Sequence, residues 1–200
     1  MRNYYGHVFD PGWQNNPGHW IAVVWGLWAL SWFAAEMWSR QTAARASFAQ
    51  EAPYRIVTLI GVLMLFGFLD QGAFGHGWEV TESEAWVSLA LIAAGFAFTW
   101  WARLHLGALW SGTITRKEGH RIIDSGPYAI VRHPIYTGVL LAMFATAACR
   151  GRWEGVIGAA LCALGFWMKA RQEEKFLSET LGPDYAAYRR RVHMLVPYLL

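Results

Sequence analysis

The stretch Gly126-Pro-Tyr-Ala-Ile-Val-Arg-His-Pro-Ile-Tyr-Thr-Gly138 leads directly into an apolar run that continues to Ala148. Proline has no backbone N–H and disfavours helix at the preceding residue, so we predict a helix that begins at Pro134 with His133 at its boundary. The unpaired N–H groups of a first helical turn attract an anion such as a carboxylate. The stretch therefore predicts an apolar helix whose start, beside His133 and Tyr136, can bind a negatively charged group.

This apolar run is one of five. Hydrophobic residues make up 55% and charged residues 16% of the sequence, a composition outside the soluble range. We predict an all-α integral membrane protein with about five transmembrane helices, a cytosolic loop and C-terminal helices. The last two runs alone would extend over about 21 Å of a hydrocarbon core of about 30 Å, so they either continue into flanking residues or are only partly submerged. The runs are Trp20–Trp38, Tyr54–Phe74, Ala85–Trp101, Ile135–Ala148 and Gly155–Met168.

The basic residues are distributed unevenly between the two sides of such a helical bundle. Of the 17 Lys and Arg residues, only Arg2, Arg150 and Arg152 fall on the side of the N-terminus. The positive-inside rule then places the N-terminus outside and the C-terminus in the cytosol. This topology explains the net charge of +3 without a nucleic-acid partner. Cys149 and Cys162 have no metal-like spacing, so we expect no metal site.

The chain is predicted to form one domain with two unequal parts. Residues 1–101 are mainly a membrane scaffold, and residues 102–200 hold most of the residues that suggest chemistry. The fifth helix is expected to continue past the membrane and to stop at Gly182-Pro183. Asp184 then begins a last short helix that carries Tyr185, Tyr188 and Val192 on one side.

Two adjacent acids, Glu173 and Glu174, follow the fifth apolar run. Adjacent helical positions are about 100° apart, so the two side chains point in different directions and either could face inward. Ordinary ion pairs on the helix surface are an equally good explanation, because Lys169 lies four positions before Glu173 and Arg171 lies three before Glu174.

The ordered set of these motifs resembles the isoprenylcysteine carboxyl methyltransferase family, which is related to phospholipid methyltransferases. The resemblance covers about residues 102–197, nearly half of the chain, and the first two apolar runs match only in being hydrophobic. The motifs are Arg132-His133-Pro134-x-Tyr136-x-Gly138, Glu173-Glu174, Leu181-Gly182-x-x-Tyr185-x-x-Tyr188, Val196-Pro197, and upstream Arg103-x-x-Leu106-Gly107-x-x-Trp110-Ser111 and Gly119-His120-x-Ile122.

The resemblance implies methyl transfer from S-adenosylmethionine, bound on the cytosolic side. The residues that it implies as cofactor contacts lie before the fourth helix, after the fifth apolar run and in the tail: Tyr128 in the segment Gly126 to Val131, Arg132, His133, Tyr136, Glu173, Glu174 and Pro197. A carboxylate suits ribose hydroxyls or the cofactor ammonium, and the helix start at Pro134 suits the methionine carboxylate.

The acceptor is left open by the sequence. A lipophilic carboxylate such as an isoprenylcysteine needs only a cation to hold it, for which Arg171 and Arg103 are the candidates. An amine of an aminophospholipid or a thiol must also lose a proton, which would give a glutamate such as Glu174, or His105, a catalytic role. The absence of extensions suggests a protein of the bacterial inner membrane whose partners are a lipophilic substrate and membrane lipids. An NADPH-dependent membrane reductase and a membrane protein that is not an enzyme are the remaining alternatives.

Overall fold

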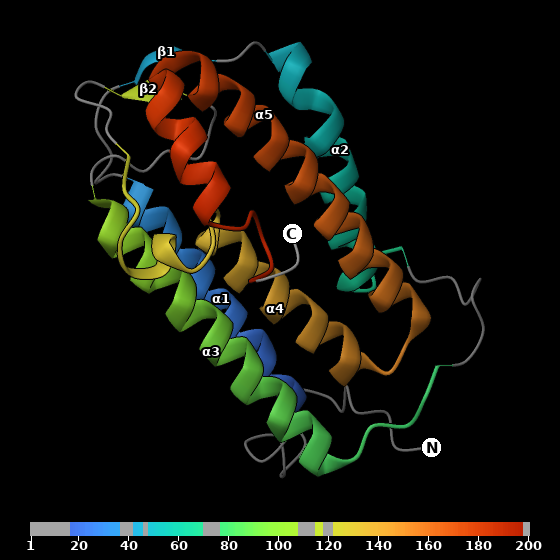
Figure 1. Cartoon of the computed structure of the whole chain (residues 1–200). Helices are drawn as coiled ribbons and strands as arrows, with labels where there is room; N and C mark the ends of the chain where they lie inside the picture. Colours follow the sequence, from blue (N-terminus) through green and yellow to red (C-terminus); the bar gives the residue numbers. More distant parts are fainter. Residues whose placement is uncertain are drawn as a thin grey trace.

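A computed structural model describes residues 17–36, 42–45, 48–69, 77–107, 115–117 and 122–197. Over these ranges five α-helices account for most of the structure (Figure 1). The helices are α1 (Pro17–Glu36), α2 (Phe48–Leu65), α3 (Glu82–Leu106), α4 (Pro134–Arg150) and α5 (Trp153–Arg191). The smaller elements are the strands β1 (Thr42–Arg45) and β2 (Thr115–Lys117) and the 3₁₀ helix η3 (Gly126–Ala129).

The predicted helical architecture is confirmed, with one helix at each apolar run. The strands were not expected: β1 and β2 pair in antiparallel fashion and join the segment after α1 to the segment after α3. Two of the described helices, α1 over Pro17–Ala35 and α3, are long and apolar enough to cross a membrane, whereas α4 is apolar but shorter. That all five helices cross a membrane stays a prediction.

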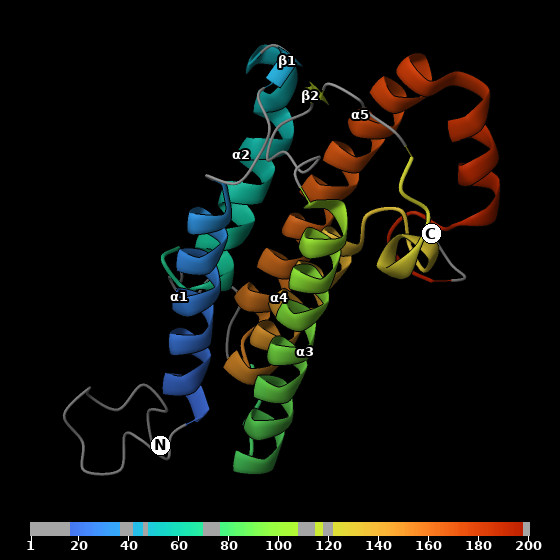
Figure 2. The same cartoon turned by 90° about the vertical axis from the view of Figure 1, so that its left-hand side faces the viewer.

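The helices pack in pairs through glycines. Helix α3 lies against α4, α2 lies against α5, and α1 covers α3 (Figure 2). A Cβ on Gly138 would approach the carbonyl oxygen of Gly95 to 2.5 Å, and a Cβ on Gly158 would approach the backbone nitrogen of Leu65 to 2.5 Å. Only glycine permits such close approach of two helix backbones, a common device in membrane helices. The last glycine of the Arg-His-Pro motif therefore has a packing role.

Tryptophans fasten α1 to the bundle. Trp28 stacks on Phe96 with ring centroids 4.9 Å apart, and its Nε1 donates to Thr99 Oγ1 at 2.9 Å. Trp25 Nε1 donates to Thr146 Oγ1 of α4, also at 2.9 Å. These indole N–H groups are satisfied inside the bundle, whereas Trp20 and Trp153 are exposed, as expected for residues at a membrane interface.

The predicted break at Gly182-Pro183 is confirmed. Gly182 has φ 57° and ψ −130°, and it interrupts the helical geometry of α5. The chain folds back there, so that the residues after Gly182 form a second limb beside η3 and the start of α4 (Figure 2). Tyr185, Tyr188 and Val192 of this limb are buried together, as the sequence predicted. The fold-back returns the C-terminal residues to the segment before α4.

Candidate active site

The segment before α4 is held by the segment after α5, which we call the C-terminal strap (residues 192–197). The backbone N–H of Arg132 donates to the His193 carbonyl at 2.8 Å, and that of His133 donates to the Met194 carbonyl at 3.1 Å. Thr137 Oγ1 donates to the Leu195 carbonyl at 2.6 Å. As predicted, α4 begins at Pro134 with His133 as its N-cap. The strap therefore fixes the backbone from which the site side chains project.

Glu174 lies at the centre of the site. Its side chain is 3% exposed and lies within ion-pair distance of three cationic groups: Arg132 Nε at 2.6 Å, Arg189 Nε at 3.3 Å and His133 Nε2 at 3.4 Å. Burial opposes ionisation of this carboxyl, but the charges of His133 and Arg132 and the hydrogen bond from Arg132 lower its pKa from 4.5 to about 2. Glu174 is therefore a buried, charged carboxylate.

His133 bridges the two glutamates. Its Nδ1 lies 3.4 Å from Glu173 Oε2, while its Nε2 faces Glu174. Burial alone would lower the pKa of His133, but the two carboxylates raise it above its ordinary value. The ring therefore favours the imidazolium form, in which both nitrogens are donors. Both glutamates face the same group, although adjacent helical positions point in different directions.

Glu173 has two further partners. Tyr136 Oη donates to Glu173 Oε1 at 2.7 Å, and Lys169 Nζ lies 3.9 Å from the same oxygen. Burial by itself would raise the pKa of Glu173, but the contacts with His133, Lys169 and Tyr136 lower it. The result is a cluster of two carboxylates and several fixed cations, which suits a ligand that carries both charges and hydroxyl groups.

Two cavities adjoin this cluster. The larger, about 630 Å³, lies along α5 and is lined by Arg171, Gln172, Glu174, Lys175, Ser178, Glu179 and Arg189. The smaller, about 280 Å³, reaches the C-terminal strap and is lined by Arg132, Trp167, Arg171, Arg189, Arg190, Val192, His193 and Met194. Arg171 and Arg189 line both cavities, so the two adjoin each other.

Four predicted residues lie outside this cluster. Arg103 is fully buried, and it donates to the Ala35 carbonyl at 2.8 Å and to the Gly107 carbonyl at 2.6 Å, at the ends of α1 and α3.

Tyr128 is buried in η3, where its carbonyl accepts from Tyr188 Oη at 2.7 Å. Pro197 ends the described part of the strap. Arg171 lines the cavities with its guanidinium 5.7 Å from the Trp167 ring. The roles predicted for these four residues stay predictions, although the contacts of Arg103 are those of a helix-end clamp.

The sequence did not identify Arg189 and Lys169 as site residues. Lys169 is indicated by the sequence only as a surface ion-pair partner of Glu173. Arg189 reaches Glu174 because the chain folds back at Gly182, and no local motif indicates that contact. The motif residues Trp110, Ser111, Gly119 and His120 lie outside the described residues.

Comparison with known proteins finds two methyltransferases and a metal-resistance protein that are similar to this chain. Protein-S-isoprenylcysteine O-methyltransferase B of Arabidopsis thaliana is 32% identical over 111 residues, which cover 55% of this chain and 51% of that protein. The cobalt-zinc-cadmium resistance protein CzcN of Cupriavidus metallidurans is 32% identical over 132 residues, covering 63% and 56%. Methanethiol S-methyltransferase 2 of Bradyrhizobium diazoefficiens is 45% identical over 73 residues, covering 36% and 27%.

The chain spans about half the length of the curated relatives that it matches over the longest stretches. The matching family is described as the isoprenylcysteine carboxyl methyltransferase (ICMT) family, and its match covers residues 87–179. That interval contains α4, the Arg-His-Pro segment and both glutamates, which are the parts that build the ion-paired cluster. Over residues 87–179, slightly less than half of its length, the chain is therefore similar to the isoprenylcysteine carboxyl methyltransferase family.

Proposed function

We propose that this protein is a membrane methyltransferase that transfers a methyl group from S-adenosylmethionine to a lipophilic acceptor. The observation that carries the proposal is the buried cluster of Glu173, His133 and Glu174, which lies where the apolar part of α5 ends and a cavity of about 630 Å³ begins. The family match and the methyltransferase names of several relatives support it.

The residues present fit this cofactor. A cavity of about 630 Å³ is within the usual range for small-molecule sites, about 300–1,000 Å³. Its lining offers carboxylates for an ammonium or ribose hydroxyls, and guanidinium groups for a carboxylate. Glu174 Oε2 and His133 Nε2 are buried atoms that make no hydrogen bond with any described residue, although each lies beside a charged partner. Glu174 would thus hold the cofactor together with Arg189.

S-adenosylmethionine supplies a methyl group that is already activated, so the protein has to orient the acceptor and exclude water. The ion pairs of Glu174 and the hydrogen bonds of the strap fix the site before a ligand arrives, which limits the entropy lost on binding. Since Glu174 has a pKa of about 2, its carboxylate is a poor proton acceptor. This property favours an acceptor that needs no deprotonation, such as the carboxylate of an isoprenylcysteine-like molecule.

A thiol or an amine is the alternative acceptor. The similarity to a methanethiol S-methyltransferase favours the thiol. In that case the base would have to be another group, because the lowered pKa values of Glu173 and Glu174 make both carboxylates weak proton acceptors. N-methylation of an aminophospholipid would face the same requirement.

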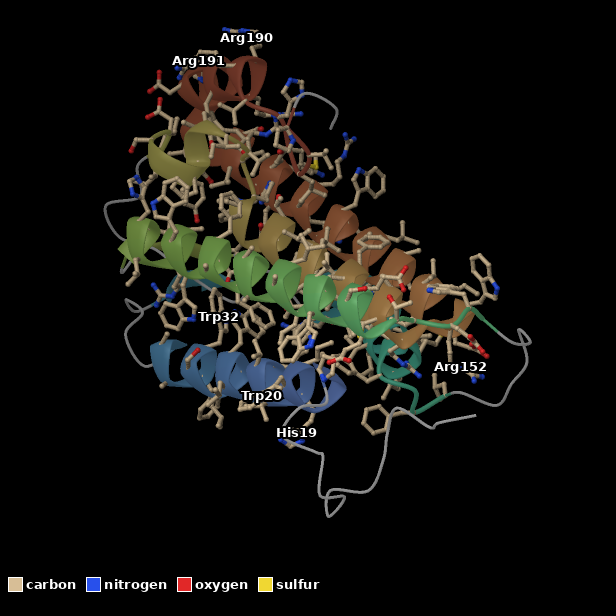
Figure 3. The ribbon with its side chains drawn as sticks, turned by 90° about the horizontal axis from the view of Figure 1, so that it is seen from below. His19, Trp20, Trp32, Arg152, Arg190 and Arg191 are labelled. Carbon is tan, nitrogen blue, oxygen red and sulfur yellow. The ribbon has the colours of Figure 1, made fainter. Side chains whose placement is uncertain are left out.

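We place the protein in a bacterial inner membrane, with the cluster on the cytosolic side. The uneven distribution of basic residues supports this orientation. Arg152 lies at the opposite end of the molecule from Arg190 and Arg191 (Figure 3). The chain then acts as one domain, in which residues 1–101 provide most of the membrane scaffold and residues 102–200 most of the site.

The first prediction tests the cofactor. Purified protein in non-ionic detergent should bind S-adenosylhomocysteine in a calorimetric titration and should not bind NADPH. It should then methylate at least one of three acceptors offered with S-adenosylmethionine: an S-farnesylcysteine derivative, a phosphatidylethanolamine or a small thiol. Binding of NADPH alone would favour the reductase alternative and contradict the proposal.

The second prediction concerns Arg171, which we propose holds the acceptor. Its guanidinium lines both cavities, next to Trp167 at the end of the apolar part of α5. Arg171→Ala should lower methyl transfer to a carboxylate acceptor at least tenfold, about 1.4 kcal/mol, with little change in affinity for S-adenosylhomocysteine. Arg191→Ala removes an exposed cation of the same helix that lines neither cavity and is the matched control. Equal activities of the two variants would exclude this role for Arg171.

A further inference from the structure

The smaller of the two cavities is strongly basic. Four of the eight residues that line it are arginines, and none of the eight is an acid. Arg132 and Arg189 share the carboxylate of Glu174. Arg171 and Arg190 form no ion pair with any carboxylate in the described part of the chain. Guanidinium groups gathered around one cavity repel each other, so an anion that binds among them is stabilised.

Arg132 is held in place before any ligand binds. Its side chain is 9% exposed, its Nε donates to Glu174 Oε1 at 2.6 Å, and its Nη1 donates to the carbonyls of Arg189 and Val192. The third nitrogen, Nη2, makes no hydrogen bond with any residue that the structure describes. These contacts fix the plane of the guanidinium and leave the N–H groups of Nη2 as donors for an anion in the cavity.

The lining of this cavity also has an apolar part. Trp167, Val192 and Met194 line it together with the cations. Trp167 is 43% exposed near the end of the apolar run of α5, a position typical of tryptophans at a membrane interface, and the Arg171 guanidinium lies 5.7 Å from its ring. A small soluble anion needs only the cations. The apolar side chains suit the glycerol and the first methylene groups of a lipid.

We propose that the smaller cavity binds a phosphate group, carried by the headgroup of an anionic phospholipid. Phosphate oxygens accept paired hydrogen bonds from guanidinium groups, which makes arginine well suited to this ligand. The volume of about 280 Å³ is just below the usual range for a whole small molecule, about 300–1,000 Å³, and suits a headgroup. In the orientation proposed above, the site faces the cytosolic leaflet, whose anionic lipids attract basic residues. The inference goes beyond the proposed function and does not depend on the identity of the cofactor or the acceptor.

Arg190 separates this site from the larger cavity. Arg171 and Arg189 line both cavities, whereas Arg190 lines only the smaller one. The next residue, Arg191, lines neither cavity and pairs with Asp124 at 3.0 Å, at the same end of the molecule (Figure 3). Both arginines are exposed, so replacing either should change the stability of the fold little. Arg190→Gln and Arg191→Gln thus remove the same charge from neighbouring positions, one inside the proposed site and one outside it.

The test is a titration of the full-length protein in non-ionic detergent at about 0.15 M salt, where weak attraction between exposed charges is screened. The probes are dioctanoyl phosphatidylglycerol, dioctanoyl phosphatidylcholine and inorganic phosphate, and the rise in the midpoint of thermal unfolding gives each dissociation constant. Wild type should bind the phosphatidylglycerol at least fivefold more tightly than the phosphatidylcholine. Arg190→Gln should weaken binding of the phosphatidylglycerol about fivefold, the effect of one cation near an anionic headgroup, whereas Arg191→Gln should stay within about twofold of wild type.

Each other outcome is also decisive. Binding of inorganic phosphate as tight as that of the phosphatidylglycerol, with the same dependence on Arg190, would keep the phosphate site and make soluble phosphate its source. Equal losses in Arg190→Gln and Arg191→Gln would show attraction to the overall charge of the tail and would overturn the site. Equal binding of the two lipids by wild type, or no binding of any probe, would overturn it as well. The titration with S-adenosylhomocysteine is a separate measurement, so these failures would leave the proposed function intact.

Discussion

Glu174→Gln is expected to lower the free energy of unfolding by about 3–5 kcal/mol, the range for removing one partner of a buried ion pair. Glutamine keeps the shape of the side chain and removes its charge. Arg132 and His133 are then buried cations with one counter-charge fewer, and Arg189 loses its carboxylate partner. The strap contacts should loosen with the cluster, because Arg132 also donates to the Val192 and Arg189 carbonyls.

The matched control is Glu179→Gln. Glu179 lines the same cavity but is exposed, so its substitution should change stability by no more than about 0.5 kcal/mol. Denaturant titrations of both variants in the same non-ionic detergent would give the comparison. If Glu174→Gln unfolded at the same denaturant concentration as the control, the ion pairs of Glu174 would contribute nothing to the fold.

Ligand binding separates the two roles of Glu174. Under conditions where the folded variant is the dominant species, Glu174→Gln should bind S-adenosylhomocysteine more weakly by about 1.5–3 kcal/mol, the range for a hydrogen bond to a charged group. A variant that is less stable but binds normally would assign Glu174 to the scaffold alone.

The sequence predicted the helices because each depends on a local signal. Apolar runs marked the five helices, Pro134 marked the start of α4, and Gly182-Pro183 marked the fold-back of α5. The motif residues His133, Tyr136, Glu173 and Glu174 do lie together, in contacts that an isolated helix could not show. The alternative explanation, an ion pair between Lys169 and Glu173, is also present, but this ion pair belongs to the buried cluster and not to the helix surface.

What the sequence could not show depends on contacts between distant backbones. The strap is held by carbonyl oxygens of residues 192–195, and any residue type presents such an oxygen. Arg103 could not be recognised as a helix-end clamp, because its partners are also carbonyl groups. The positions of Glu173 and Glu174 on the helix could not show which of the two faces the site, because the His133 ring contacts both.

The last prediction is a pH dependence specific to Glu174, which lies beyond the apolar part of α5. Its pKa is lowered from 4.5 to about 2 by His133 and Arg132, although burial acts in the opposite direction. A carboxyl whose pKa is lowered by folding stabilises the protein above its unfolded pKa and loses that contribution as the pH falls towards its folded pKa.

For Glu174, the contribution is complete near neutral pH and decreases by about 2 kcal/mol between pH 6 and pH 3. His133 acts in the other direction. Its raised pKa stabilises the fold below pH 6.5, the ordinary value, and the contribution is lost as the pH rises through the raised value. The free energy of unfolding should therefore be greatest at a pH above the unfolded pKa of Glu174 and below the raised pKa of His133.

The difference between wild type and Glu174→Gln isolates the effect from that of the other carboxylates. This difference should shrink by about 2 kcal/mol as the pH falls from 6 to 3, because the unfolded chain takes up a proton at Glu174 over this range while the folded carboxylate keeps its charge. Glu179→Gln, which replaces an exposed glutamate, is measured alongside as the control. A wild-type advantage over Glu174→Gln that is as large at pH 3 as at pH 6 would show that the charge of Glu174 is not what stabilises the cluster, and would favour a packing role for this side chain.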